Sequence, residues 1–344
     1  MKKVFVGLSC GVDSSVATLL LKKQGYLVTG VYMKNWSQSL PGFDCPWKED
    51  YQDAKRVAVQ LGINFLVFDF EKQYKQKVVD YMLNEYRLGH TPNPDIMCNQ
   101  EIKFKLFLEA SLEGGADFVA TGHYAKTDHG HLYKARDHKK DQTYFLYRVN
   151  SSALEKTLFP LGDYLKTEIR EIAFKNNLVT KDKKESMGIC FVGKVGIKDF
   201  LTNFVNTSPG PLIDQNGVEV GTHDGAIFYT IGQRHGLNVG GGLPYFVTSK
   251  DMATNTVYVT SQLDDEKLWS QNIKLVSSHY INSRPNKNQN YQVRVRHQGE
   301  LLDAEINGSE VVLKDKVKAL NSGQSVVIYD DEEVLGGGII STTN

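Results

Sequence analysis

The segment LSCGVDSS, at residues 8–15, has residue types suited to holding a phosphate group. It combines small residues, hydroxyl groups and Asp13, and it stands between an apolar run and a helical pattern. The first turn of a helix presents unpaired backbone N–H groups and the positive end of the helix dipole, which together bind anions. The segment has neither the lysine of a G-x-x-x-x-G-K-[ST] loop nor a G-x-G-x-x-G pattern. Asp13 could cap the helix or help to bind Mg²⁺, so an ordinary N-cap is the competing interpretation.

The other candidates for chemistry are four cysteines: Cys10, Cys45, Cys98 and Cys190. No two of them form a C-x-x-C pair, so we expect no metal site built on cysteines. A permanent disulfide framework is not expected in a reducing compartment. Isolated cysteines are most often small buried hydrophobes, and the residues alone leave both packing and nucleophilic chemistry open.

The elements that must position these residues alternate between strand and helix. Apolar runs predict strands at residues 3–8, 27–33, 63–70 and 116–124. Helical patterns lie between and after them, at residues 14–25, 49–62, 71–88 and 100–113. This alternation predicts an α/β domain with a parallel sheet, and places the segment 8–15 at the C-terminal edge of that sheet.

The pattern changes after about residue 205. Alternating apolar residues with Gly, Asn and Asp turns predict strands in AIFYTIG (226–232), in YQVRVRHQG (291–299) and in most of the remaining chain. We expect three domains: an α/β domain at 1–204 that carries the segment 8–15, a small β-rich central domain at 205–268, and an antiparallel β-barrel at 269–344.

Composition adds only weak constraints on function. Lys plus Arg and Asp plus Glu both number 40, so the chain lacks the excess of base typical of nucleic-acid binders, although a neutral total can hide a basic face. No apolar run approaches the length of a membrane span, and the N-terminus lacks the pattern of a signal peptide. We expect a cytoplasmic protein with no membrane partner.

The segment LSCGVDSS resembles the S-G-G-x-D-S loop of the PP-loop ATPases, which cleave ATP between its α- and β-phosphates and adenylate an acceptor. Cys10 replaces the first glycine, and this is tolerable if its φ is negative and its Cβ points away from the phosphate. Four further segments follow in order: HTPNPDIMCNQEIKF (90–104), ATGHYA (120–125), KDQTYFLY (140–147) and SMGICFVG (186–193). With GAIFYTIGQRHGL (225–237), they make the chain resemble the tRNA-specific 2-thiouridylases over nearly its whole length.

The resemblance implies a reaction in which sulfur replaces a uridine carbonyl oxygen. Transfer of AMP from ATP, bound with Mg²⁺, turns the C2 oxygen into a leaving group, and sulfur then attacks C2. By resemblance, Cys190 carries the sulfur as a persulfide, and Cys98 is the partner nucleophile that forms a transient disulfide with it. Asp95 corresponds to the acid/base that also contacts the base. Cys45 matches no role.

The resemblance also assigns binding residues and partners. The tRNA is expected to be an acceptor for Lys, Glu or Gln with its wobble uridine splayed out, and a cysteine desulfurase or sulfur-relay protein supplies the sulfur. From the sequence alone, the alternation of Arg294 and Arg296 favours a solvated strand face. The implied ATP ligands are Gly7, Leu8, Ser9, Cys10, Gly11, Val12, Asp13, Ser14, Met33 and Gly122. The implied tRNA contacts are Asn93, Pro94, Asp95, His123, Lys140, Asp141, Gln142, Arg296, His297 and Gln324.

Two alternatives stay open on the sequence. Another PP-loop enzyme, such as an adenylating ligase, would not need the paired cysteines, and a 4-thiouridine enzyme normally brings other RNA-binding modules. A non-catalytic tRNA-binding protein with a degenerate ATP loop would be consistent with Cys10.

Overall fold

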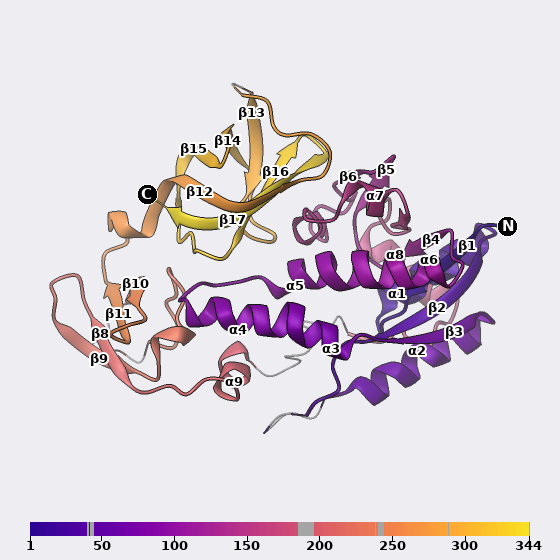
Figure 1. Cartoon of the computed structure of the whole chain (residues 1–344), viewed down its shortest axis with the longest axis horizontal. Helices are drawn as coiled ribbons and strands as arrows, with labels where there is room; N and C mark the ends of the chain where they lie inside the picture. Colours follow the sequence, from indigo (N-terminus) through magenta and orange to yellow (C-terminus); the bar gives the residue numbers. More distant parts are fainter. Residues whose placement is uncertain are drawn as a thin grey trace.

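The computed structural model describes residues 1–39, 41, 45–184, 196–237, 239, 244–287 and 289–343. Cys190 lies outside these residues. Figure 1 shows three regions in chain order: an α/β region, a small β-rich region and a barrel. This is the architecture that the sequence predicts.

The first region is built on a parallel sheet with the strand order β3-β2-β1-β4-β7. The predicted strands correspond to β1 (Lys3–Gly7), β2 (Leu27–Lys34), β3 (Asn64–Asp69) and β4 (Phe118–Ala120). β4 is shorter than predicted because the chain leaves the sheet after Ala120, and the short β7 (Thr157–Leu158) was not predicted. β1 lies between β2 and β4, and open α/β sheets bind ligands at such a point of reversal.

Helices cover this sheet, principally α1 (Val12–Lys23), α2 (Trp47–Leu61), α6 (Phe107–Glu113) and α8 (Lys166–Lys175), with the short α7 (Ser151–Leu154) near β7. On α2 the buried residues are Ala54, Val57, Ala58 and Leu61, which is the face that their helical spacing predicts. They pack in one cluster with Val16 and Ala17 of α1 and with Ile169 and Ala173 of α8. The packing fixes α8 against α1.

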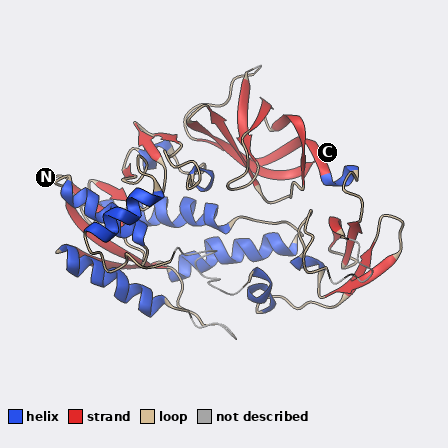
Figure 2. Cartoon of the chain, turned by 180° about the vertical axis from the view of Figure 1, so that it is seen from behind, coloured by secondary structure: helices blue, strands red, loops and turns tan. Residues whose placement is uncertain are grey.

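A long helical hairpin leads away from the sheet. One arm consists of α3 (Glu71–Tyr74), the π-helical segment η1 (Lys75–Val79) and α4 (Asp80–Arg87). The returning arm consists of α5 (Pro94–Met97), the π-helical segment η2 (Cys98–Leu106) and α6. Figures 1 and 2 both show the arms side by side, with their connecting loop directed toward the β-rich parts of the molecule. π-Helical turns are frequent at functional sites, and η2 begins at Cys98.

The central region follows α9 (Ile197–Thr202) and contains a sheet with the order β10-β11-β8-β9. Its strands are β8 (Gly210–Ile213), β9 (Glu219–His223), β10 (Phe246–Asp251) and β11 (Thr256–Thr260). The strand predicted at 226–232 is wrong: Ala226–Phe228 forms the short 3₁₀ helix η4. Ile227 packs in the core of the first region and Tyr229 in that of the central region, whereas alternate residues of a strand point to the same face.

The last region is a closed antiparallel barrel with the order β12-β15-β14-β13-β16-β17, completed by pairing of β12 with β17. It follows the short helix η5 (Glu266–Leu268). The strands are β12 (Trp269–Tyr280), β13 (Asn290–Arg294), β14 (Leu302–Asn307), β15 (Glu310–Lys318), β16 (Ser325–Asp330) and β17 (Glu333–Thr343). β13 ends at Arg294, so Arg296 and His297 lie in the following turn and not on the predicted strand face.

The barrel is joined to the first region by backbone pairing and by a shared core. A hairpin of β5 (Lys126–Asp128) and β6 (His131–Tyr133) extends the barrel sheet through pairing with β17. Val327, Tyr329 and Val334 of the barrel belong to the same buried cluster as Cys98 and Phe107. The position of the barrel is therefore determined by the core that also surrounds Cys98. Within the described residues, no helix is long and apolar enough to cross a membrane.

Candidate functional site

The segment 8–15 forms a loop organised by its own serines. The Ser14 hydroxyl lies 3.0 Å from the Ser9 hydroxyl and accepts a hydrogen bond from the Ser9 N–H at 3.1 Å. The Ser9 hydroxyl in turn accepts the Gly11 N–H at 3.2 Å. Ser15 donates to the Gly11 carbonyl at 2.8 Å and accepts from Thr180 at 3.0 Å. The loop conformation is thus held locally by short hydroxyl side chains.

Cys10 meets the first of the two conditions that the sequence places on it, since its φ is negative; the direction of its Cβ relative to a phosphate stays a prediction. Its side chain lies beside Asp50 of α2 and Lys183. Burial, followed by the hydrogen bond and charge of Asp50, raises the pKa of the Cys10 thiol to about 12, and Lys183 opposes this only in part. The thiol is therefore protonated at neutral pH and is a poor nucleophile.

Two glycines allow the backbone to close around the loop. A Cβ on Gly122, which follows β4, would lie 2.7 Å from the Ser14 nitrogen and 2.9 Å from the Asp13 carbonyl carbon. A Cβ on Gly7 would lie 2.9 Å from Cε of Met33, at the end of β2. The structure therefore brings Gly7, the loop, Met33 and Gly122 together at the reversal point of the sheet, as the resemblance implies.

Asp13 does not cap α1, whose N-terminus has no side-chain cap. Both oxygens of its carboxylate accept from Nζ of Lys166, at 2.7 and 2.8 Å. The Tyr124 hydroxyl donates to Oδ1 of Asp13 at 2.9 Å. The Asp13 carboxylate is therefore not an N-cap of α1. The donor set and the close approach at Gly122 fit a pyrophosphate group.

The described ranges contain no cluster of three or more His, Cys, Asp or Glu side chains arranged to hold a metal ion. Asp13 is the acidic side chain of the loop itself. It is therefore the residue that would contact a Mg²⁺ ion arriving with a nucleotide.

Asp95 and Cys98 lie on the returning arm of the helical hairpin. Asn93 caps α5 by accepting the Asp95 N–H at 3.1 Å, and the buried Pro94 occupies the first helical position, where it needs no N–H partner. Asp95 is half-buried, and desolvation raises the pKa of its carboxyl while the charge of Lys103 opposes the rise. Cys98 is only 4% exposed and packs in the largest core cluster. The arm thus carries an acid of raised pKa one helical turn from a thiol.

Lys103 is a functional candidate that the sequence reasoning missed, although it lies within the motif at 90–104. Its Nζ is 3.3 Å from Nε2 of His123, and the opposite ring nitrogen Nδ1 is 2.7 Å from the Thr121 hydroxyl. A lysine ammonium only donates, so Nε2 is the acceptor and Nδ1–H donates to Thr121. Burial, with Lys103 second, sets the pKa of His123 well below its usual value. His123 is a buried neutral imidazole that fixes Lys103.

A second group of implied tRNA residues meets across the boundary between the first region and the barrel. Asp141 is buried and accepts from Arg294 at 2.7 Å, from Thr143 at 2.8 Å and from the Ala135 N–H at 3.1 Å. The ring of His297 lies 4.2 Å, centroid to centroid, from that of Phe145 in the 3₁₀ helix η3 (Thr143–Phe145). The Arg294–Asp141 ion pair holds the two regions together.

The neighbours of that ion pair differ in exposure. Burial is the largest cause of the lowered pKa of His297, and the charges of Arg294 and Lys140 lower it further. Gln142 accepts the Tyr124 N–H at 3.0 Å, whereas Arg296 is exposed and donates to the Lys318 carbonyl at 3.3 Å. Direct contact of these residues with tRNA stays a prediction.

The turn that contains Gln324 packs against the loop before Asn93. The Thr91 N–H donates to the Ser322 carbonyl at 2.8 Å, and Asn321 accepts the Ile231 N–H of the central region at 2.8 Å. Gly323 has a φ of +90°, and a Cβ there would lie 2.9 Å from the Thr91 nitrogen. All three regions therefore meet beside the segment that leads to Asp95.

Comparisons with known proteins agree with this arrangement. Residues 2–194 match the family described as tRNA methyl transferase HUP domain, residues 198–261 the tRNA methyl transferase PRC-barrel domain, and residues 270–340 the aminomethyltransferase beta-barrel domain.

Relatives named tRNA-specific 2-thiouridylase MnmA match over nearly the whole chain. The protein of Listeria innocua is 46% identical, with 99% of this chain and 95% of the relative covered. Those of Enterococcus faecalis and Bacillus subtilis are each 44% identical, with 98% of this chain and 95% and 94% of the relatives covered. The chain belongs to the family of the tRNA-specific 2-thiouridylases.

Proposed function

We propose that this protein is an ATP-dependent tRNA sulfurtransferase that converts the C2 carbonyl of a wobble uridine to a thiocarbonyl. The observation that carries the proposal is the continuity of the site through residues 121–124. Gly122 touches the nucleotide loop, and the adjacent His123 reaches Lys103, whose charge acts on Asp95. A nucleotide in the loop and a uridine beside Asp95 would therefore lie on the two sides of one short segment.

In the first step, the C2 oxygen of the uridine attacks the α-phosphate of ATP and pyrophosphate leaves. The backbone N–H groups at the start of α1 and the hydroxyls of Ser9 and Ser14 would hold the phosphates. Asp95, with its raised pKa, is suited to remove the N3 proton of the uracil ring. Lys103 would stabilise negative charge that develops on the base, and neutral His123 holds its ammonium group in place.

In the second step, the terminal sulfur of a persulfide on Cys190 attacks C2, and AMP leaves. The thiolate of Cys98 then attacks Sγ of Cys190, which breaks the sulfur–sulfur bond to the base and forms a disulfide between the two cysteines. The transferred sulfur is reduced and the two thiols are oxidised, so an external thiol must reduce the disulfide before the next turnover. Cys190 lies outside the described residues, and its role rests on the family motif.

The division of labour that we propose follows the regions. Residues 1–204 bind ATP with Mg²⁺ and perform the chemistry, residues 205–268 brace the loop before Asn93, and residues 269–344 contact tRNA near Arg296, His297 and Gln324. Acceptors for Lys, Glu and Gln are the proposed tRNAs, and a cysteine desulfurase or sulfur-relay protein is the proposed donor. We propose that the reaction takes place in the cytoplasm.

The test is incubation of the purified protein with unmodified tRNA, ATP, Mg²⁺ and a persulfide donor, followed by nucleoside mass spectrometry. We expect 2-thiouridine to form only when ATP is present, and the variant Cys190→Ser to bind ATP normally but form none. No 2-thiouridine from the wild type, under conditions where an established enzyme of the family succeeds, would refute the proposal. An adenylating ligase would keep its activity in Cys98→Ser and Cys190→Ser, and a non-catalytic tRNA-binding protein would adenylate no tRNA.

A further inference from the structure

The nucleotide loop lacks positive charge of its own. Residues 8–15 contain no lysine or arginine, and Asp13 adds a negative charge where phosphate would bind. In a Walker-type loop, the lysine within the motif compensates the β- and γ-phosphates. A triphosphate held here must receive that compensation from another part of the chain or from bound cations.

Lys166 supplies one such charge from far along the sequence. It is the first residue of α8, and its side chain is 12% exposed. Its Nζ donates to both oxygens of Asp13, on the first turn of α1. The lysine therefore already lies at the helix N-terminus that would hold the phosphates, with a carboxylate as its partner.

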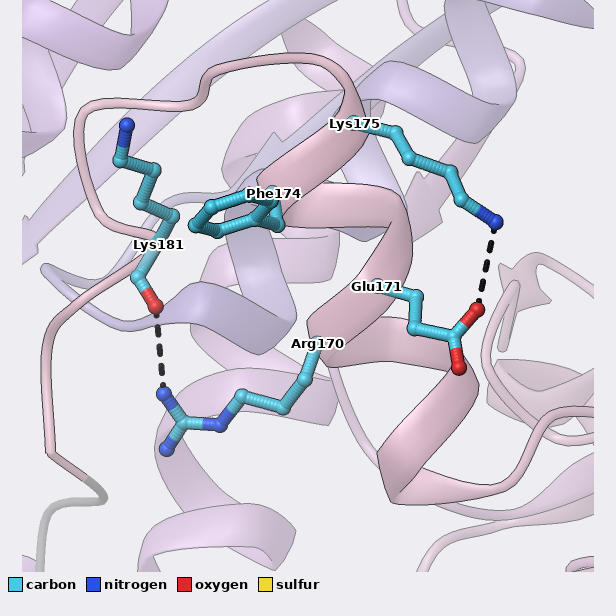
Figure 3. A pocket seen from close by; sticks show the side chains of 5 residues that line it. All are labelled: Arg170, Glu171, Phe174, Lys175 and Lys181. Atoms are coloured by element: carbon cyan, nitrogen blue, oxygen red, sulfur yellow. Dashed lines mark hydrogen bonds and ion pairs between the residues drawn. The ribbon is translucent and has the colours of Figure 1, made fainter.

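Lys183 supplies a second charge at the other end of the loop. It is hydrogen-bonded to Asp53 of α2, lies 3.8 Å from Asp50, and adjoins the Cys10 thiol. Its backbone is held by Arg170, whose Nη1 donates to the carbonyl of Lys183 at 2.8 Å and to that of Lys181 at 3.3 Å; Figure 3 shows Arg170 reaching the latter. Arg170 is one helical turn beyond Lys166, so α8 positions both lysines.

We propose that Lys166 and Lys183 bind the phosphate groups of ATP, each exchanging its carboxylate partners for phosphate oxygens when the nucleotide enters. This inference rests on the proposed use of ATP. Phosphate carries more negative charge than a carboxylate and accepts more hydrogen bonds, so the exchange keeps each ammonium group fully paired. Departure of Lys166 also leaves the Asp13 carboxylate available to the Mg²⁺ that accompanies ATP.

A purely structural role makes a different prediction. If Lys166 only holds Asp13 in place, its effect on ATP binding must disappear once Asp13 is neutral. If Lys166 binds phosphate, its effect must persist. A double-mutant comparison in which Asp13→Asn is the reference separates these roles, and it leaves no unpaired buried carboxylate in the Asp13→Asn/Lys166→Met protein.

The experiment measures the dissociation constant of MgATP by isothermal titration calorimetry, with folding checked by circular dichroism and thermal unfolding. The proteins are wild type, Lys183→Met, Asp13→Asn, Asp13→Asn/Lys166→Met and the control Lys175→Met. Lys175 is exposed on the same helix and pairs only with Glu171, at 3.2 Å, among the interactions in Figure 3. Loss of a charge-assisted phosphate contact weakens binding by about 10-fold or more.

We expect Asp13→Asn/Lys166→Met to bind ATP about 10-fold or more weakly than Asp13→Asn. Lys183→Met should show a similar loss relative to wild type. Lys175→Met should change the dissociation constant of MgATP by less than about twofold. Equal affinities of Asp13→Asn and the double variant would overturn the role of Lys166. Wild-type ATP affinity in folded Lys183→Met would overturn the role of Lys183 in phosphate binding. If Lys183→Met does not fold, Asp53→Asn/Lys183→Met is compared with Asp53→Asn in the same way. Absence of ATP binding by the wild type would instead refute the proposed function, and this inference with it.

Discussion

The nucleotide loop and the region around Cys98 are built in opposite ways. The loop consists of consecutive residues whose hydroxyls bond to one another, and Ser9 is exposed. The Cys98 region takes Asp95 and Lys103 from one helical arm and His123 from the segment after β4, and the barrel adds to its core. The first is a local structure, whereas the second exists only when distant parts of the chain are packed together.

The two regions also differ in access. At the loop, Ser9 is exposed and Asp13 is half-buried, and no side chain caps the first turn of α1, although Val12 and Ser14 are buried. Cys98 is 4% exposed within the largest core cluster. The proposed disulfide with Cys190 would therefore require local opening near the start of η2. ATP binding and sulfur transfer should therefore respond separately to mutation.

Among these variants, Cys98→Ser should show the largest difference between its effect on thiolation and its effect on ATP binding. Because the proposed partner nucleophile is lost, formation of 2-thiouridine from a persulfide donor should fall by about 10³-fold or more. ATP affinity should be unchanged, since Cys98 does not belong to the loop. Mass spectrometry and calorimetry measure the two effects. The control is Cys45→Ser, which alters a half-buried thiol that lies neither in the nucleotide loop nor on the helical arm of Cys98, although it packs against the same core cluster. Thiolation by Cys98→Ser at the wild-type rate would remove Cys98 from the mechanism.

Arg294→Met tests whether the Cys98 region depends on the barrel. The substitution leaves the Asp141 carboxylate buried without its cation, and we expect a loss of about 3–5 kcal/mol in the free energy of unfolding. Asp141→Asn/Arg294→Met should recover part of this loss. Urea unfolding gives the stabilities, and thiolation should fall more than ATP affinity. An equal loss of both functions would show that the regions are not separable in this way.

Gly122→Ala tests the contact between the regions. A Cβ at this position would lie 2.7 Å from the Ser14 nitrogen, so β4 and α1 must move apart. We expect a destabilisation of about 1–3 kcal/mol, together with weaker ATP binding. The control is Gly196→Ala, where the nearest atom to a new Cβ is Oδ2 of Asp199 at 3.8 Å. Wild-type ATP affinity in Gly122→Ala would contradict the placement of the nucleotide beside Gly122.

Asp95→Asn tests whether the Asp95 carboxyl is desolvated in the folded protein. Desolvation raises the pKa of Asp95 above 3.8, so between the unfolded and folded pKa values the folded protein binds more protons, and its stability falls as the pH rises. At pH 7 the uncharged amide should therefore make the protein more stable by about 1 kcal/mol, while thiolation is lost.

The stability gain in Asp95→Asn should shrink as the pH is lowered toward 3.8, where the native carboxyl becomes neutral. Urea unfolding at pH 7 and pH 4 measures it. Glu113→Gln, which alters an exposed acid, should change stability by less than about 0.5 kcal/mol at either pH. A destabilised Asp95→Asn at pH 7 would mean that the carboxylate is well solvated or paired.

The smallest effect is expected for Cys10→Gly. The thiol has a pKa of about 12 and is protonated at the pH of the assay, and glycine is the residue of the family's loop. Thiolation and ATP affinity should stay within about twofold of wild type, because the substitution removes a half-buried, protonated thiol that no proposed step uses. A large loss of thiolation in Cys10→Gly would show that the Cys10 thiol takes part in the reaction.

Much of the fold follows from local patterns. The buried face of α2 is the one that the spacing of Ala54, Val57, Ala58 and Leu61 predicts. The segment 226–232 was predicted wrongly because its apolar residues enter two cores, which a pattern cannot reveal. The turn at Arg296 was missed for a similar reason: Arg294 ends its strand to reach buried Asp141, and the chain then turns.

The sequence by itself determined the nucleotide loop and the helical patterns, because hydrogen bonding in a loop and the periodicity of a helix are short-range effects. The order of the family motifs and the positions of the cysteines are also read directly from it. It also showed that the loop lacks a lysine. Only the tertiary structure decided that Lys166 and Lys183 lie at this loop and that Lys103, whose charge lowers the pKa of Asp95, reaches His123. The partner of a charged side chain is set by how distant elements pack, and α8 packed on α1 is what brings positive charge to the phosphate site.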